Sequence, residues 1–141
     1  MKQQLRELVY KKGREKLGEI TGYYKYRIVA ELKIIKEMNA EDVILCLERV
    51  VSIAKKINVK LEVDQEQLKS SFVCYLLGIA LEDPIEAKLR FELPEDMGEI
   101  RIDHSPEDMP AFRRELSAED EMLFFGTLIK HAPKEQPTEN R

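Results

Sequence analysis

Residues 39–57, NAEDVILCLERVVSIAKKI, decide how the rest of this chain packs. Apolar side chains recur in this stretch at steps of three and four, which places them on one face of a helix. Ile44, Val51 and Ile53 make that face wider than a simple two-layer contact requires. Each buried Val, Leu or Ile contributes roughly 1.5–3 kcal/mol. The stretch therefore predicts a buried central helix that is covered from two sides, with Asn39 as its N-cap.

The segment before this helix, residues 23–38, is compatible with two structures. Its apolar residues alternate as they would in a half-buried strand, but they also form one face of a helix. The later residues are good helix formers and a strand of this length would be unusual, so a helix is favoured. A helix here would cover the extra width of 39–57, whereas a strand would leave it open to a partner. Residues 2–17 form a further predicted helix.

After residue 57 the hydrophobic period changes. Alternating residues predict a short strand over 59–63, and Asp64 precedes a helical pattern over 65–81. A second alternation over 85–93, followed by a turn and a return over 99–103, predicts a hairpin. Two short carboxyl-terminal helices are then expected, and Ser117 begins the last of them.

These elements predict an α+β fold in one domain. We expect an amino-terminal helical bundle around the central helix (about 40–57), followed by carboxyl-terminal helices. The predicted antiparallel sheet combines 59–63, 85–93 and 99–103. The domain is expected to span residues 1–131, and residues 132–141 to be a disordered tail because they have little to bury.

The composition is that of a globular cytoplasmic protein. With 43% hydrophobic and 35% charged residues, the 141-residue chain suits a folded domain and not a disordered one. It has no apolar run of the ~20 residues that a membrane span needs and no secretory signal, so no membrane association is expected. Cys46 and Cys74 lie in apolar patterns and are predicted to be buried thiols.

Motifs for catalysis are missing from the sequence. It contains no Gly-rich phosphate loop, nucleophile elbow or His-Glu-x-x-His motif, and two histidines are too few for an ordinary zinc site. Asp103, His104 and Ser105 are neighbours that alternate across a strand, so they cannot form a catalytic relay. We therefore predict no enzyme activity, no cofactor and no metal site. Whether the acidic residues between 95 and 108 bind a cation stays open.

The charge is divided unevenly along the chain. Residues 1–60 hold 14 Lys/Arg and 8 Asp/Glu, whereas residues 61–141 hold 9 and 19, which gives net charges of +6 and −10. Cations neutralise phosphates and aromatic rings stack on unpaired bases, so the basic, Tyr-rich start suits nucleic acid. The candidate residues for that role are Lys11, Lys12, Arg14, Lys16, Tyr24, Lys25 and Arg27.

The wide central helix and the acidic second half favour a different function. The leading hypothesis is a non-enzymatic interaction protein, such as an adaptor, a chaperone-like factor or a regulator, that contacts a protein partner or a second copy of itself as a homodimer. A nucleic-acid-binding regulator is the alternative. The predicted protein-contact residues are Ile44, Val51, Ile53, Glu95, Asp96 and Glu99.

Overall fold

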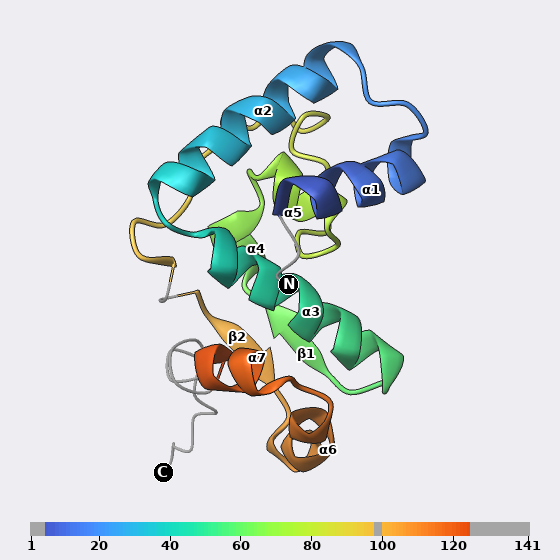
Figure 1. The fold of residues 1–141 in the computed structure, drawn as a ribbon, viewed down its shortest axis with the longest axis vertical. Coiled ribbons are helices and arrows are strands. Elements are labelled where there is room, and N and C mark those ends of the chain that lie inside the picture. Colours follow the sequence, from blue (N-terminus) through green and yellow to red (C-terminus); the bar gives the residue numbers. More distant parts are fainter. Residues whose placement is uncertain (1–4, 98–99, 125–141) are drawn as a thin grey trace.

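The computed structural model describes residues 5–97 and 100–124, and over these it is mostly helical with a small antiparallel sheet and carboxyl-terminal helices, consistent with the predicted α+β class (Figure 1). The helices are α1 Leu5–Leu17, α2 Gly22–Glu37, α3 Glu41–Lys56, α4 Gln65–Leu68, α5 Phe72–Leu76, α6 Met109–Arg114 and α7 Ala118–Leu123, with a 3-10 turn at Pro106–Asp108. The strands are β1 Leu61–Val63 and β2 Ile102–His104.

Helix α3 is the predicted central helix, and its buried residues lie on most of its circumference. It packs against α1 on one side and against β1 and α7 on others. Acidic residues in its first turn and lysines in its last turn complement the helix dipole. Asn39 is not its N-cap, as predicted, because Ala40 takes that position. Asn39 instead adopts a left-handed backbone with φ of 58° and ends α2.

Residues 23–38 form a helix, which confirms the favoured interpretation. Helix α2 does not supply the expected cover for α3, because it packs mainly against α5 (Figure 1). The broad face of α3 is covered by α1, α7 and β1 instead. Ile44 is fully buried as a result.

The sheet pairs β1 with β2 in antiparallel register, with Leu61 opposite His104 and Val63 opposite Ile102. The predicted strand over 85–93 is wrong. Its backbone bonds are used in turns, where Ala87 N–H donates to Asp83 and Leu89 N–H donates to Pro84.

Side chains hold the rest of that segment. Ser70 Oγ both donates to the carbonyl of Glu92 (2.8 Å) and accepts from its N–H (2.9 Å). The Arg27 guanidinium donates to Leu89 O (3.3 Å). These contacts leave the segment with few backbone groups for a strand ladder.

The helix predicted over 65–81 is broken in two. Asp64 caps α4, as predicted, by accepting from Glu66 N–H (2.9 Å). Ser71 then begins α5, because its hydroxyl accepts from Cys74 N–H (3.1 Å). Ser117 caps α7 in the same manner, accepting from Asp120 N–H, which confirms the predicted start of that helix.

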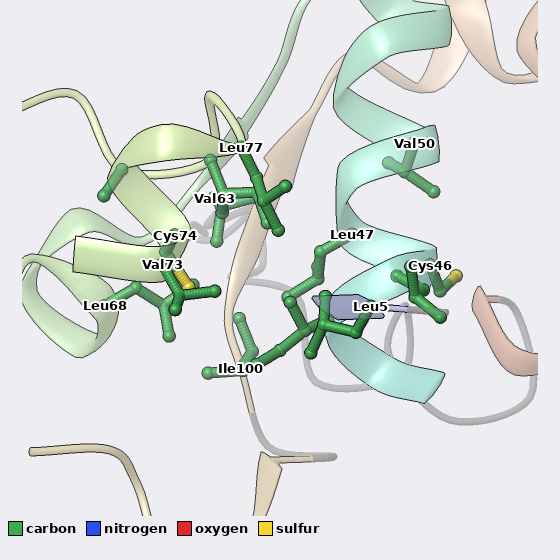
Figure 2. Close-up of a cluster of buried hydrophobic side chains, with 14 of the residues drawn as sticks. Leu5, Cys46, Leu47, Val50, Val63, Leu68, Val73, Cys74, Leu77 and Ile100 are labelled. Atoms are coloured by element: carbon green, nitrogen blue, oxygen red, sulfur yellow. The ribbon is translucent and has the colours of Figure 1, made fainter. Parts of the chain in front are cut away.

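The core lies between α3 on one side and α5 with the sheet on the other (Figure 2). Leu47 from α3, Val73 and Cys74 from α5 and Leu5 from α1 lie there, whereas Cys46 lies on the opposite side of α3, with its Sγ 3.9 Å from Asp120 O of α7. Cys46 and Cys74 are free, buried thiols, as predicted. The domain boundary at 131 and the tail at 132–141 lie outside the described residues.

Candidate functional site

A groove of about 420 Å³ lies between α1, α3 and the end of α5. Three lysines, Lys12, Lys16 and Lys55, line it together with Glu15. Its other lining residues are Val51, Ser52, Leu76, Leu77 and Gly78. The groove thus combines apolar side chains with a basic lining, which is the form of a site for an anionic ligand.

Helical spacing brings these lysines together. Lys12 and Lys16 are four residues apart on α1, so they share one face. Lys55 lies on the last turn of α3. Gly78 follows α5 with a φ of +85°, a left-handed conformation that favours glycine. A Cβ at residue 78 would lie 3.9 Å from Lys55 Nζ, an ordinary contact distance, so the backbone conformation and not lack of space favours glycine here.

The three lysines differ in how far their charge is balanced. Lys12 Nζ pairs with Glu48 Oε2 at 3.0 Å, and that buried carboxylate also accepts from Ser52 at 3.0 Å. Neither Lys16 nor Lys55 forms an ion pair with any other residue that the structure describes. Two ammonium groups therefore stay available for phosphate or carboxylate.

A row of aromatic rings begins next to the groove. Lys16 Nζ lies 4.7 Å from the centroid of the Tyr75 ring. Tyr75 stacks on Phe72 with centroids 6.0 Å apart, and Phe72 stacks on Tyr24 at 5.6 Å with only 10° between the ring planes. Phe72 is fully buried, whereas Tyr24 is 38% exposed. The row links α1, α5 and α2.

A buried ion pair locks α2 to α5 beneath this row. Glu31 is fully buried and accepts from Arg27 Nε (2.7 Å), Ser71 Oγ (2.9 Å) and the N–H groups of Phe72 (2.8 Å) and Val73 (3.0 Å). The Glu31 carboxylate thereby satisfies the first amides of α5. Arg27 also donates to Ser70 O at 2.7 Å. Every partner of Glu31 in this set is a donor.

Burial raises the pKa of Glu31 above its usual value. The N–H groups of Val73 and Phe72, the Ser71 hydroxyl and the Arg27 charge oppose that rise. A perturbed carboxyl can mark a functional site. Here its partners belong to the backbone and to neighbouring side chains of the fold, so it holds the two helices in place.

The structure divides the predicted nucleic-acid residues into three groups. Lys12 and Lys16 line the groove, and Tyr24 ends the aromatic row. Lys11, Arg14 and Lys25 are exposed but do not line the groove. Arg27 is buried by its pairing with Glu31 and cannot contact a ligand.

The predicted protein-contact residues are also dispersed. Ile44 is fully buried, and Val51 and Ile53 are half-buried against the core, with Val51 also lining the groove. Glu95 and Asp96 are exposed on a separate segment, and Glu99 lies outside the described residues. The surface expected on α3 is therefore mostly closed. The largest exposed apolar side chains of α2 are Tyr23, Tyr24, Tyr26, Val29 and Ile34.

The open question of a cation among the acidic residues gains no support from their geometry. Within residues 5–97 and 100–124, no three His, Cys, Asp or Glu side chains are placed to hold a metal ion together. Glu107 accepts from Ser105 (2.8 Å), and its own backbone N–H and that hydroxyl lower the pKa of its carboxyl.

Residues 3–95, which include α1 to α5, match the family described as bacterial DNA polymerase III alpha NTPase domain. The chain belongs to this DNA polymerase III alpha family. The DNA polymerase III subunit alpha of Thermotoga maritima is 41% identical over 86 residues, or 61% of this chain. That match covers 10% of the Thermotoga protein, so the chain spans about a tenth of the length of this curated relative. No solved structure matches the chain.

Membership of the DNA polymerase III alpha family corrects three predictions. The chain is related to a DNA polymerase, so a non-enzymatic adaptor or regulator is the wrong class of function. The same relationship to an enzyme contradicts the prediction of no enzyme activity. The alternative hypothesis, a nucleic-acid-binding regulator, is wrong in its regulatory part for the same reason. A bacterial DNA polymerase family agrees with the predicted cytoplasmic location.

None of the helices within the described ranges is both long and apolar enough to cross a membrane.

Sequence reasoning missed Lys55, Tyr75 and Gly78, which all lie at least 39 residues after Lys16 in the sequence. Only the fold brings them beside Lys16. The family relationship was missed for a different reason. It rests on a match over residues 3–95 as a whole.

Proposed function

We propose that this chain serves DNA synthesis as a DNA-contacting part of a polymerase III alpha-type protein. The groove of Lys12, Lys16 and Lys55 is its contact with the phosphate backbone. The observation that carries this proposal is the position of all three lysines in one groove inside the stretch that matches the family. Ammonium groups on a shallow, partly apolar surface bind phosphates without reading sequence.

Two further features support phosphate binding in the groove. Lys16 and Lys55 have no carboxylate partner among the described residues, so binding a phosphate breaks no ion pair at either position. Ser52 and Gly78, two small residues, also line the groove. Glu15 reduces the positive charge of the groove but leaves it net basic.

Fluorescence anisotropy with a labelled primer–template DNA tests the proposal. Replacing Lys12, Lys16 and Lys55 together with Gln should weaken binding at low salt by at least about tenfold. The slope of log affinity against log salt concentration should become flatter by about two to three units, because each lost phosphate contact removes about 0.9.

The matched control replaces Lys33, Lys36 and Lys60, which are exposed and lie outside the groove, with Gln. Both triple variants remove the same charge, so a general electrostatic attraction would weaken equally in both. Equal losses, or no binding of the native protein at about 50 mM salt, would refute the groove as a DNA contact.

We further propose that a second copy of the chain packs on the outer face of α2. Tyr26, Val29 and Ile34 are 66%, 51% and 41% exposed on this helix, which makes its outward side more apolar than a solvated helix face. Lys33 and Glu37 on the same helix pair with each other at 3.6 Å, so covering this face leaves neither charge unpaired. Light scattering after size exclusion should show dimers at tens of micromolar, and Val29→Asp should give monomers.

Leu81→Asp is the control for this proposal, because Leu81 is 72% exposed and lies outside α2. It should leave the dimer unchanged. A native protein that is monomeric throughout this concentration range contradicts self-association.

A further inference from the structure

We propose that the groove and the aromatic row together form a track for a single strand of nucleic acid, with an unpaired base stacked on Tyr24. This inference rests on the proposed function and specifies the form of the DNA. The groove lysines hold the phosphates of the strand, and the row beginning at Lys16 receives its bases.

The Tyr24 ring is prepared for stacking before any ligand arrives. One of its faces lies against Phe72, at 5.6 Å between centroids and nearly parallel, while 38% of the residue is exposed. Phe72 is fully buried and cannot shift easily. A base that stacks on the outer face of Tyr24 therefore meets a ring already fixed in place, which lowers the entropic cost of binding.

The buried ion pair below the row fixes the distance between the two ends of the track. Tyr24 and Glu31 lie on α2, and Glu31 bonds directly to the backbone N–H groups of Phe72 and Val73 on α5. Tyr75 follows on the same short helix, and Lys16 covers its ring. The groove and the stacking platform are thus parts of one rigid unit.

Lys16 belongs to both parts of the track. Its ammonium lines the groove and also lies 4.7 Å from the Tyr75 ring, which is within range of a cation–π contact. A phosphate bound at Lys16 places the adjoining nucleotide next to Tyr75. Phe72, the next ring in the row, is buried, so Tyr24 is the next ring that a base can reach. Cations that follow the backbone next to aromatic rings are the usual features of single-strand binding.

The aromatic row distinguishes single strands from duplex. Lysines contact the phosphates of either form, but the faces of paired bases are covered by their neighbours in the helix stack. Only an unpaired base can place its face on Tyr24. Stacking on an aromatic side chain depends little on which base is present, so the track is expected to bind most sequences.

The experiment compares labelled oligo-dT with a duplex of the same length by fluorescence anisotropy, using the whole chain. The native protein should bind oligo-dT more tightly than duplex. Tyr24→Leu should weaken oligo-dT binding by about fivefold to a hundredfold, the range found for loss of one base stack. It should change duplex binding by less than about twofold, because phosphate contacts remain. Tyr24→Phe keeps the ring and should bind oligo-dT like the native protein.

The control variant is Tyr23→Leu, since Tyr23 is 57% exposed, more than Tyr24, and is not in the stacked row with Phe72. Its oligo-dT affinity should stay within about twofold of native, as surface residues outside a contact contribute little. Circular dichroism of Tyr24→Leu and Tyr24→Phe checks that both variants are folded.

The outcomes separate this inference from the proposed function. Equal affinity for oligo-dT and duplex, with no effect of Tyr24→Leu, would refute the single-strand track and leave the groove as a general phosphate contact. Equal losses in Tyr24→Leu and Tyr23→Leu would also refute it. Binding of neither DNA would refute the proposed function itself.

Discussion

The α2–α5 junction and the α1–α3 groove contain the same kinds of charged side chain but place them in opposite environments. At the junction, Arg27 and Glu31 are 7% and 0% exposed and are bonded to each other and to backbone groups. In the groove, Lys16 and Lys55 are exposed at the surface with no ion pair to any described residue. The first pair fixes the fold, whereas the second set forms the groove that we propose binds phosphate.

This difference shows that a basic residue near tyrosines in sequence does not by itself indicate a ligand contact. Arg27 and Lys16 both fit that pattern, and only Lys16 has a charge available at the surface. Partner geometry separates the two, since Arg27 has an acid four residues later on the inner face of its helix. Four predictions test how far the contrast extends.

The largest effect is expected from Glu31→Gln. The amide keeps one acceptor oxygen but directs N–H groups toward a site surrounded by donors, and it leaves the buried Arg27 without a counter-charge. Breaking one side of a buried pair costs about 3 kcal/mol, so the free energy of unfolding in urea should fall by about that amount.

Glu37→Gln is the matched control on the same helix, because its pair with Lys33 is exposed on both sides (76% and 62%). Exposed pairs contribute about 0–1 kcal/mol, so this variant should stay near native stability. Similar losses in the two variants would show that burial of the Arg27–Glu31 pair has no special role.

The features of the fold that depend on residues close together in the sequence were predicted correctly, whereas those that depend on distant residues were not. Helix α3 and the caps at Asp64 and Ser117 were predicted because periodicity and capping act within a few residues. The strand over 85–93 was wrong although its alternation is complete. There the backbone bonds to turns, to Ser70 and to Arg27, and none of these partners is visible in an alternating pattern.

The site was less predictable than the fold for a related reason. Lys12, Lys16 and Tyr24 were identified by residue type alone. Their neighbours Lys55 and Tyr75 come from α3 and α5, and only the packing of α1 against both helices brings them together. Ile44 shows the opposite error, since its predicted exposure was removed by α1, α7 and β1 packing around α3.

A smaller effect is expected at the contact of α3 with α7. Asp120 accepts two bonds from Arg49, at 2.5 and 2.6 Å, but the Arg49 side chain is 41% exposed. Asp120→Asn should therefore lower the free energy of unfolding by about 1.5 kcal/mol. This is the lower end of the range for hydrogen bonds that involve charged groups. Glu121→Gln, which loses an exposed pair with Arg113, is the control. A loss as large as that of Glu31→Gln would contradict the ranking by burial.

The two buried thiols report where each variant loosens the fold. Burial raises the pKa of both Cys46 and Cys74 to about 12, so neither should react with a thiol reagent at pH 8 while the protein is folded. Glu31→Gln should accelerate labelling of Cys74, which lies on α5 beside Ser71. Asp120→Asn should accelerate the labelling of Cys46, whose Sγ lies 3.9 Å from Asp120 O. Peptide mass spectrometry assigns the labelled site, and equal acceleration of both thiols in either variant would indicate global unfolding instead.

The smallest effect on stability is expected from Lys55→Gln in the groove. No described residue forms an ion pair with this ammonium, so the free energy of unfolding should change by no more than about 0.5 kcal/mol. The same variant should still weaken primer–template binding. The slope of log affinity against log salt concentration should become flatter by about 0.9, the contribution of one phosphate contact. Together with Glu31→Gln, this completes the comparison: a charge that the fold uses changes stability, and a charge that the fold leaves exposed changes binding. Loss of stability without loss of DNA affinity in Lys55→Gln would move this lysine from the binding surface to the structural framework.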